Sequence, residues 1–160
     1  MPRQALSPAA RIAKAYPDAV QERCEEHGCS LGLEGLPERV VLKGELVPHQ
    51  GRICDGLVFV AVEERGVALA AVELKSGSYY PEEVLEQLQN GATAGSGIAS
   101  EQQVTISRFL AVLLHRRGSR GSTAEFRHLR RAEIEFGGRK QRVTIEQCGA
   151  CLSELVFLAR

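Results

Sequence analysis

Apolar and polar residues follow one another along the chain in blocks that predict a succession of strands and helices. Apolar runs bounded by glycine or charged residues predict strands at 39–47, 52–64, 66–76 and 105–115. Two shorter runs, at 132–136 and 141–147, flank a pair of glycines and predict a hairpin. Apolar residues at helical spacing predict helices at 9–27, with a break at Pro17, and at 81–94, 122–131 and 151–159.

The order of these elements predicts the fold class. Strands 52–64 and 66–76 carry apolar residues on both faces, so we expect central strands with helices covering each side. Helices and strands alternate after these strands, which is typical of an α/β protein. With 160 residues, 44% of them hydrophobic, the chain is long enough for one core. We therefore expect a single α/β domain built on a central mixed β-sheet flanked by helices.

Two opposite charges interrupt the end of the apolar run 66–76. Glu73 and Lys75 are two residues apart, so they point to the same face of the predicted strand. Residues 64–66 predict a three-residue hairpin loop. In that register Asp55, on the preceding strand, lies opposite Lys75 and diagonal to Glu73. A loop of a different length by one residue would turn Asp55 to the other face, so the predicted site depends on this register.

Two carboxylates that converge at the end of a buried sheet require a cation nearby. Mg²⁺ suits such a site because it accepts one or two carboxylates and keeps several waters, and Mn²⁺ also prefers oxygen ligands. Asp55 and Glu73 are the predicted metal ligands, and the backbone carbonyl of Leu74 is a third candidate oxygen. Lys75 is predicted to act on the attacking water or on the phosphate. This combination predicts hydrolysis of a phosphodiester bond.

The segment CDGLVFVAVEERGVALAAVELKSG, residues 54–77, resembles the PD-(D/E)XK nuclease superfamily. In that superfamily an Asp on one core strand is followed by Glu-x-Lys on the next strand of a hairpin. Asp55, Glu73 and Lys75 stand at the positions of this motif. Cys54 replaces the proline that is usually written before the Asp. The resemblance implies a metal-dependent nuclease in which these three residues are catalytic.

The resemblance covers the core of the chain, residues 18–115, and leaves 116–160 as a basic C-terminal part. It implies one restriction endonuclease-like domain over residues 1–160, similar to the small Holliday junction resolvases of the superfamily. The helix after Glu-x-Lys often carries a glutamine in such nucleases, which implies a catalytic role for Gln87 ahead of Gln89. Further acids that could complete the site are Glu22, Glu25 and Glu26, on the predicted first helix, and Glu45 on the strand before Asp55.

Positive and negative charges are unevenly distributed, although the net charge is zero. Residues 1–104 carry 9 Lys and Arg against 15 Asp and Glu, whereas residues 105–147 carry 10 against 4. A basic segment of this kind is either a footprint for a polyanion such as DNA or a set of solvated arginines. The sequence alone supports both interpretations.

The five cysteines have to be interpreted together with the expected compartment. Neither a signal peptide nor a membrane-spanning stretch is recognisable, so we expect a cytoplasmic protein in which disulfides are disfavoured. Small buried thiols are therefore the expected state of these residues. The alternative is a structural Zn²⁺ or iron–sulfur cluster held by Cys24, Cys29, Cys148 and Cys151.

Three further features have a structural interpretation beside a functional one. Tyr79 and Tyr80 either stack on a base of a nucleic acid or pack in the core. His49 is expected on a surface turn. Residues 95–97 (Gly-Ser-Gly) are expected in a flexible loop, because they lack the lysine and spacing of a phosphate-binding loop.

The leading functional hypothesis is a metal-dependent nuclease, with DNA expected as a substrate before RNA. The chain has no room for a separate recognition domain, so we expect specificity to come from DNA structure, a homodimer or a partner protein, with no membrane involved. The alternative is a catalytically inactive nuclease-fold subunit that binds nucleic acid or a partner protein. A third hypothesis is an α/β protein in which Glu73 and Lys75 form only an ion pair.

Overall fold

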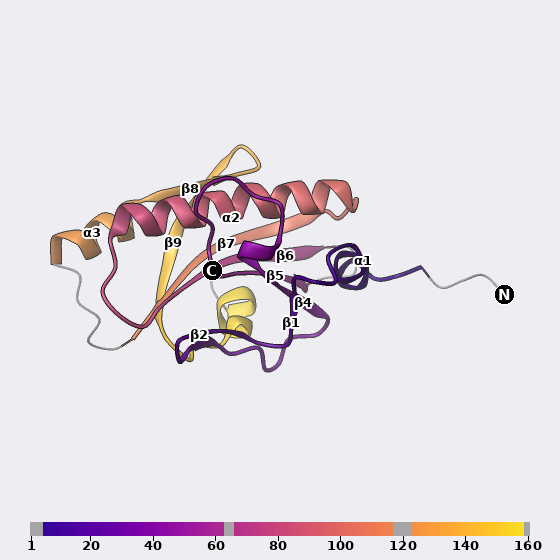
Figure 1. The fold of residues 1–160 in the computed structure, drawn as a ribbon, viewed down its shortest axis with the longest axis horizontal. Helices are drawn as coiled ribbons and strands as arrows, with labels where there is room; N and C mark the ends of the chain where they lie inside the picture. Colours follow the sequence, from indigo (N-terminus) through magenta and orange to yellow (C-terminus); the bar gives the residue numbers. More distant parts are fainter. Residues whose placement is uncertain (1–4, 63–65, 117–122, 159–160) are drawn as a thin grey trace.

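The computed structural model describes residues 5–62, 66–116 and 123–158, which fold around one large sheet (Figure 1). In spatial order, its seven strands are β1 (Val20–Gln21), β4 (Arg39–Lys43), β5 (Gly56–Ala61), β6 (Val67–Lys75), β7 (Ile106–His115), β9 (Arg139–Gln147) and β8 (Glu133–Phe136). A separate two-stranded sheet contains β2 (Cys24–Glu26) and β3 (Cys29–Leu31). The helical segments are α1 (Pro8–Ala15), the 3₁₀ turn η1 (Gly44–Leu46), α2 (Pro81–Glu101), α3 (Thr123–Arg131) and the π-helical turn η2 (Glu154–Leu158). No helix in the described parts of the chain is long and apolar enough to cross a membrane.

The directions of the strands make the large sheet mixed. β4, β5 and β6 are antiparallel neighbours, whereas β6, β7 and β9 run parallel. α2 connects β6 to β7 and lies along one face of the sheet (Figure 1). β8 pairs with β9 in an antiparallel hairpin at the edge. The predicted α/β fold with a central mixed sheet is confirmed.

The two faces of the central strands pack against different layers. Leu69 and Ala71 of β6 belong to the core that includes the buried side chains of α2. Ala70 and Val72, on the other face, pack in a second core with residues of β2, β3 and the C-terminal segment. Both faces are buried as predicted, but a small sheet and a single helical turn cover the second one. The covering segment 24–36 contains three glycines, two of them at positive φ, which favours turns over a covering helix.

The first helix is shorter than the predicted helix over 9–27. α1 ends at Ala15, and the residues after it form β1 and β2. Pro17 lacks a backbone N–H and disfavours helical geometry at Tyr16, the residue that caps α1. The break at Pro17 is therefore the end of the helix, and the prediction of a helix beyond it is wrong.

α2 is longer than predicted and lies very close to the sheet. It includes residues 95–97, for which the sequence predicts a loop. A Cβ atom at Gly91 would lie 2.4 Å from Cys54 Sγ, and one at Gly95 would lie 2.5 Å from Leu69 Cδ2. Glycine is present at these two positions because the helix backbone packs directly on the strands. The loop prediction for residues 95–97 is wrong because glycine here allows close packing of a continuous helix and does not interrupt it.

Candidate active site

The hairpin of β5 and β6 brings Asp55 and Glu73 to the same face of the sheet. Gly56 is paired with Val72 in this hairpin. One step further, Asp55 falls opposite Glu73, whereas the predicted loop requires it to be opposite Lys75. The predicted register is therefore wrong by two residues. Because side chains alternate with a period of two, this shift keeps Asp55 on the face of Glu73.

The register differs because the turn of this hairpin is displaced by one residue. Val62 N donates a hydrogen bond of 3.1 Å to Gly66 O, so Gly66 pairs across the hairpin instead of belonging to its loop. The other two residues of the predicted loop, 64 and 65, lie outside the described residues. In the sequence, Gly66 could either end the loop or be the first residue after it, so it does not distinguish the predicted turn from the observed one.

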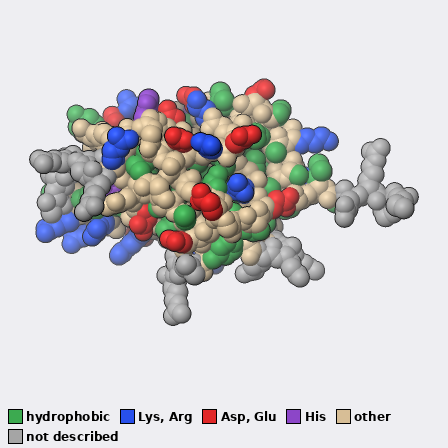
Figure 2. All heavy atoms as spheres, turned by 90° about the horizontal axis from the view of Figure 1, so that it is seen from below, with side chains coloured by type: hydrophobic (Ala, Val, Ile, Leu, Met, Phe, Trp, Pro, Cys, Tyr) green, Lys and Arg blue, Asp and Glu red, His purple; other side chains and the backbone are tan. Residues whose placement is uncertain are grey.

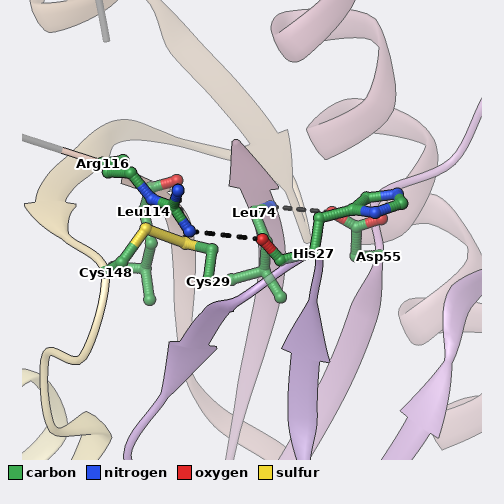
Figure 3. Close-up of a disulfide and its surroundings, with 7 residues drawn as sticks. All are labelled: His27, Cys29, Asp55, Leu74, Leu114, Arg116 and Cys148. Atoms are coloured by element: carbon green, nitrogen blue, oxygen red, sulfur yellow. Dashed lines mark hydrogen bonds between the residues drawn. A yellow bond between two sulfur atoms is a disulfide. The ribbon is translucent and has the colours of Figure 1, made fainter. Parts of the chain in front are cut away.

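Asp55 lies where the pairing of β5 with β6 ends. Its Oδ2 accepts a hydrogen bond of 2.8 Å from Leu74 N, so the side chain replaces a backbone partner (Figure 3). Its own carbonyl accepts a hydrogen bond of 2.9 Å from Gly44 N. A side chain at position 44 would prevent this contact, because a Cβ there would lie 1.9 Å from Cys54 O. These contacts hold the Asp55 carboxylate beside the end of β6.

The carbonyl of Leu74 points to the same side as the Asp55 carboxylate. In a strand, the N–H and C=O of one residue point to one side and those of the next residue to the other. The N–H of Leu74 is bonded to Asp55, so its C=O also points toward β5. The carbonyl of Lys75 instead accepts a hydrogen bond of 3.1 Å from Arg116 N, on the side of β7. The third predicted oxygen ligand is thus near the first one.

Glu73 is a buried acid with one lysine beside it. Its side chain is 1% exposed, and its Oε2 lies 3.6 Å from the Nζ of Lys75, which is 24% exposed. Burial raises the pKa of Glu73 to about 9, the neighbouring Asp55 carboxyl adds to the rise, and Lys75 opposes it. Lys75 therefore offsets only part of this effect, and the buried acid is held toward its neutral form.

Gln87 of α2 faces the same end of the sheet. α2 connects parallel strands and so runs antiparallel to β6, with Gly91 packed against Ala71. Gln87 lies about one helical turn before Gly91, roughly 6 Å along the helix. Glu73 lies two residues after Ala71, which is also roughly 6 Å along β6. This step brings Gln87 to the level of Glu73. The carbonyl of Gln87 also accepts a hydrogen bond of 3.1 Å from Cys54 N, next to Asp55 in the chain.

Gln87 is available to the site, whereas Gln89 is engaged elsewhere. Gln89 exchanges two hydrogen bonds, each of 2.9 Å, with the backbone of Glu135 in β8. Gln87 Oε1 is buried without a hydrogen-bond partner, and the buried Glu73 Oε2 has the Lys75 ammonium beside it only at 3.6 Å, beyond a hydrogen bond. Buried acceptor oxygens without a donor are costly, and a cation removes this cost. The two unsatisfied oxygens therefore fit a metal ion at this end of the sheet.

The oxygens at this end suit a hard cation. Within the described residues, no group of three or more His, Cys, Asp or Glu side chains is close enough to hold a metal ion. The candidate ligands are thus the two carboxylates of Asp55 and Glu73, with the oxygens of Leu74 and Gln87. Such a set fits Mg²⁺ or Mn²⁺, which keep several waters, better than Zn²⁺ held entirely by side chains.

The other candidate acids are not on a first helix. Glu25 and Glu26 lie on β2, and Glu22 lies between β1 and β2. Glu45 lies on the turn η1 and forms a salt bridge of 2.7 Å with Lys43. The prediction that a helix presents one of the first three acids is wrong, because the helix ends before them.

His115 is a polar residue of this region that the sequence analysis did not connect with the site. It ends β7 and is paired in register with Lys75. Its Nδ1 is buried without a hydrogen-bond partner, and burial lowers the pKa of the ring. The rings of Tyr79 and Phe126 are 6.4 and 5.3 Å from it. Parallel pairing aligns the ends of neighbouring strands. The polar residue at the end of the apolar run 105–115 was therefore the sequence feature that could have placed His115 beside Lys75.

Cys29 and Cys148 form a disulfide, which corrects the expectation that disulfides are disfavoured (Figure 3). Their Cα atoms are 5.0 Å apart, although 119 residues separate them in the chain. They meet because β3 lies at the end of β7, where Cys29 Sγ is 3.8 Å from the carbonyl oxygen of Leu114. Cys24 and Cys151 are free thiols. Two of the four predicted thiolate ligands are thus joined to each other.

Helix α3 places positive charge beside the candidate site. Its basic residues, here called the α3 basic cluster, are Arg127, His128, Arg130 and Arg131. Phe126 of the same helix contacts His115 at the end of β7, so α3 lies at the end of the sheet that carries the site. Figure 2 shows Lys and Arg side chains gathered at the left end of the molecule, where α3 lies in Figure 1.

Of the other described cations of the basic part, Arg116 lies at the site end, where its N–H donates to the Lys75 carbonyl, whereas Arg139 and Lys140 lie at the opposite end. Arg139 and Lys140 begin β9, whereas the last residue of β9 is paired with His115. Lys140 is opposite Glu135 in the β8–β9 hairpin, so an acid offsets its charge. Residues 117 and 120, two further arginines of this part, lie outside the described residues.

Comparisons of the chain with models of protein families, with curated proteins and with solved structures find no match. The candidate site is therefore interpreted from its own residues.

Proposed function

We propose that the chain is a metal-dependent nuclease of the PD-(D/E)XK type, which hydrolyses phosphodiester bonds, with DNA as the expected substrate. One observation carries this proposal. The end of a buried sheet brings together two carboxylates, of which Glu73 is 1% exposed, with Lys75 beside Glu73. Nucleases of this type place the same residue types on the same two strands.

A simple ion pair accounts for this arrangement less well. An ion pair between Glu73 and Lys75 needs no second acid, yet Asp55 lies next to them and raises the pKa of Glu73 further. The ion pair also leaves Gln87 Oε1 without a hydrogen-bond donor and brings the Lys75 ammonium only to 3.6 Å from Glu73 Oε2. A divalent cation would offset the extra negative charge and satisfy both oxygens.

The residues would divide the work as follows. Asp55, Glu73, the Leu74 carbonyl and Gln87 would hold Mg²⁺ or Mn²⁺, and the bound ion would supply positive charge that polarises the scissile phosphate. Lys75 keeps its ammonium partly exposed, so it can orient the attacking water or stabilise charge that develops on the phosphate.

The α3 basic cluster supports a nucleic acid as the substrate. Its cations lie at the same end of the sheet as the two acids, where they would bind the phosphate backbone on either side of the scissile bond. Specificity would then come from DNA structure, from a second copy of the chain or from a partner protein. A DNA substrate is consistent with a cytoplasmic location, although a disulfide such as Cys29–Cys148 is rare in that compartment.

A cleavage assay with matched lysine variants tests the proposal. Plasmid, linear, branched and single-stranded DNA, and RNA, are incubated with the chain and Mg²⁺ or Mn²⁺. Lys75→Ala is expected to slow cleavage by about 100-fold or more, with little change in the affinity for DNA, because its role is in the transition state. Lys14→Ala, which removes an exposed lysine on α1, is expected to keep the activity.

The outcomes separate the three hypotheses. Binding of DNA without cleavage under either metal would favour an inactive nuclease-fold subunit. Cleavage that persists unchanged in Lys75→Ala and in Asp55→Asn would exclude this site as its source. If both variants only lower stability and neither DNA nor metal is bound, Glu73 and Lys75 form an ion pair alone.

A further inference from the structure

The two tyrosines that follow the catalytic strand have opposite surroundings. Tyr79 is 6% exposed and packs near the ring of His115, so it belongs to the core. Tyr80 is 71% exposed, the largest exposed fraction among the large hydrophobic side chains in the described residues. An aromatic ring left this open loses the stabilisation that burial would give it. Packing therefore explains the first tyrosine and leaves the second unexplained.

Tyr80 lines an open surface pocket, here called the cavity, between the beginning of α2 and helix α3. The cavity has a volume of about 400 Å³ and is lined by Tyr80, Pro81, Glu82, Ala124 and His128. Its walls thus include two aromatic rings, two small apolar side chains and one carboxylate. A volume of this size falls in the range of sites that hold small organic groups.

The charges around the cavity favour a base over a phosphate inside it. Glu82 would repel a phosphate group, but its carboxylate can accept a hydrogen bond from an amino group of a nucleobase. His128 belongs to the α3 basic cluster, whose arginines continue from this wall along the helix. A strand whose base entered the cavity would therefore have its phosphates beside these arginines.

The cavity is close enough to the candidate site for one strand to occupy both. Five residues lead from Lys75 to Tyr80, which limits the distance between their backbones to roughly 17 Å. This distance corresponds to a few nucleotides of a single strand. A base that is paired in a duplex cannot enter, because both of its faces are stacked on neighbouring bases.

We propose that this cavity binds an unpaired nucleobase of the substrate, stacked on Tyr80. The inference rests on the proposed nuclease function and adds a substrate class to it. The enzyme would act on nucleic acid that has a single-stranded segment within a few nucleotides of the scissile bond, such as a flap, a gap or an open junction. A fully paired linear duplex would be a poor substrate.

Fluorescence of a tryptophan at position 80 tests the stacking directly. The chain contains no Trp, so Tyr80→Trp introduces a single fluorophore. Titration with a single-stranded oligodeoxynucleotide, in EDTA to prevent cleavage, is expected to quench it, because a stacked base quenches an aromatic ring. Phe157→Trp, at a residue that is 47% exposed on η2, is the matched control and is expected to show no quenching.

A binding measurement with Tyr80→Ala completes the test. This variant is expected to weaken binding of a single-stranded oligonucleotide by about 10-fold and to leave duplex binding nearly unchanged. Parallel titrations with DNA and RNA oligonucleotides of one sequence show which sugar the site accepts. Equal quenching at positions 80 and 157, or equal affinity of Tyr80→Ala and the wild type for single strands, would overturn the inference.

These readouts do not depend on catalysis, so the two proposals can fail separately. Quenching at position 80 without cleavage would support the base site and contradict the nuclease. Cleavage of fully paired DNA at the rate of a flap, with no quenching, would support the nuclease and contradict the base site.

Discussion

Glu73 has the least favourable surroundings of the residues at the candidate site. Its carboxyl is buried under α2, beside a second acid, and only Lys75 offsets its charge. A protein without a function at this position would gain stability from an apolar or amide side chain there. The cost is therefore consistent with a residue retained for a bound cation.

The raised pKa of Glu73 predicts how the metal-free protein depends on pH. The ordinary pKa is 4.5 and burial raises it to about 9 in the folded state. Between pH 4.5 and about pH 9, Glu73 keeps its proton in the folded state and releases it in the unfolded state. The free energy of unfolding is therefore highest below pH 4.5 and falls as the pH rises toward 9. Thermal unfolding in EDTA should show a melting temperature lower at about pH 8.5 than at about pH 5.

The variant Glu73→Gln isolates this contribution. It cannot ionise, so its melting temperature should fall by roughly 10 °C less than that of the wild type over the same pH range. Glu45→Gln, at an exposed acid on η1, is the control and should behave like the wild type. Parallel pH profiles for all three proteins would contradict the assignment of a raised pKa to Glu73.

At the residue scale, the sequence was sufficient to place Asp55 and Glu73 on one face of the sheet and insufficient to align them. Asp55, Glu73 and Lys75 could be predicted because charged residues at the ends of apolar runs have few structural explanations. Their alignment could not be predicted. Moving the turn by one residue along the chain shifts the register by two residues, which leaves the same side chains on each face. The face of Asp55 was predicted correctly for the same reason.

At the scale of elements, the close packing of α2 on the sheet positions Gln87 and the segment before β5. Gly91 lies where the helix touches the sheet, since a Cβ there would lie 2.4 Å from Cys54 Sγ and 3.2 Å from Ala71 Cβ. Gly97 lies in the same helix, and a Cβ there would have no atom within 4 Å. The two glycines thus have the same local propensity and different surroundings.

Alanine at these two positions should have opposite effects. Gly91→Ala should lower the free energy of unfolding by about 2 kcal/mol, because the helix must move away from the strands. Gly97→Ala should raise it by about 0.5–1 kcal/mol, since alanine favours an exposed helix. Urea denaturation measures both values. A stabilising Gly91→Ala would show that α2 does not press on Cys54.

The longest elements could be predicted from the sequence and the short ones could not. β6, β7 and α2 have apolar patterns that leave few alternatives, and their positions agree with the predicted ranges to within a few residues, apart from the C-terminal extension of α2. β1, β2 and β3 contain two or three residues each, and their pairing depends on contacts made by the rest of the chain. The disulfide was missed because Cys29 of β3 and Cys148 after β9 are 119 residues apart in the chain and meet only in the folded protein.

At the scale of the whole molecule, the uneven charge of the sequence becomes an uneven surface. The α3 basic cluster lies at the end of the sheet with the two acids, and the turn of the β8–β9 hairpin lies at the other end. The two interpretations of the basic segment therefore apply to different parts of it. We expect the cluster on α3 to bind the polyanion and the hairpin to be a solvated surface.

The salt dependence of DNA binding distinguishes these two surfaces. Replacing Arg127, Arg130 and Arg131 by Ala should weaken binding and reduce the slope of log K against log salt by roughly 2 to 3, about 0.9 for each phosphate that the variant no longer neutralises. Replacing Arg139, Lys140 and Arg142 removes the same charge and should leave the slope unchanged. Fluorescence anisotropy at several salt concentrations measures both slopes. An equal weakening of binding in the two variants would mean that the charge acts without a defined binding surface.

The central claim is that Asp55 and Glu73 hold a divalent cation, and calorimetric titration of the purified chain with Mg²⁺ and Mn²⁺ tests it most directly. The account predicts about one ion bound per chain, with or without DNA. Asp55→Asn and Glu73→Gln should each abolish this binding, whereas Glu45→Gln, at an acid already paired with Lys43, should retain it. Absence of binding to the wild type under both conditions, or binding that survives in Asp55→Asn, would contradict the account.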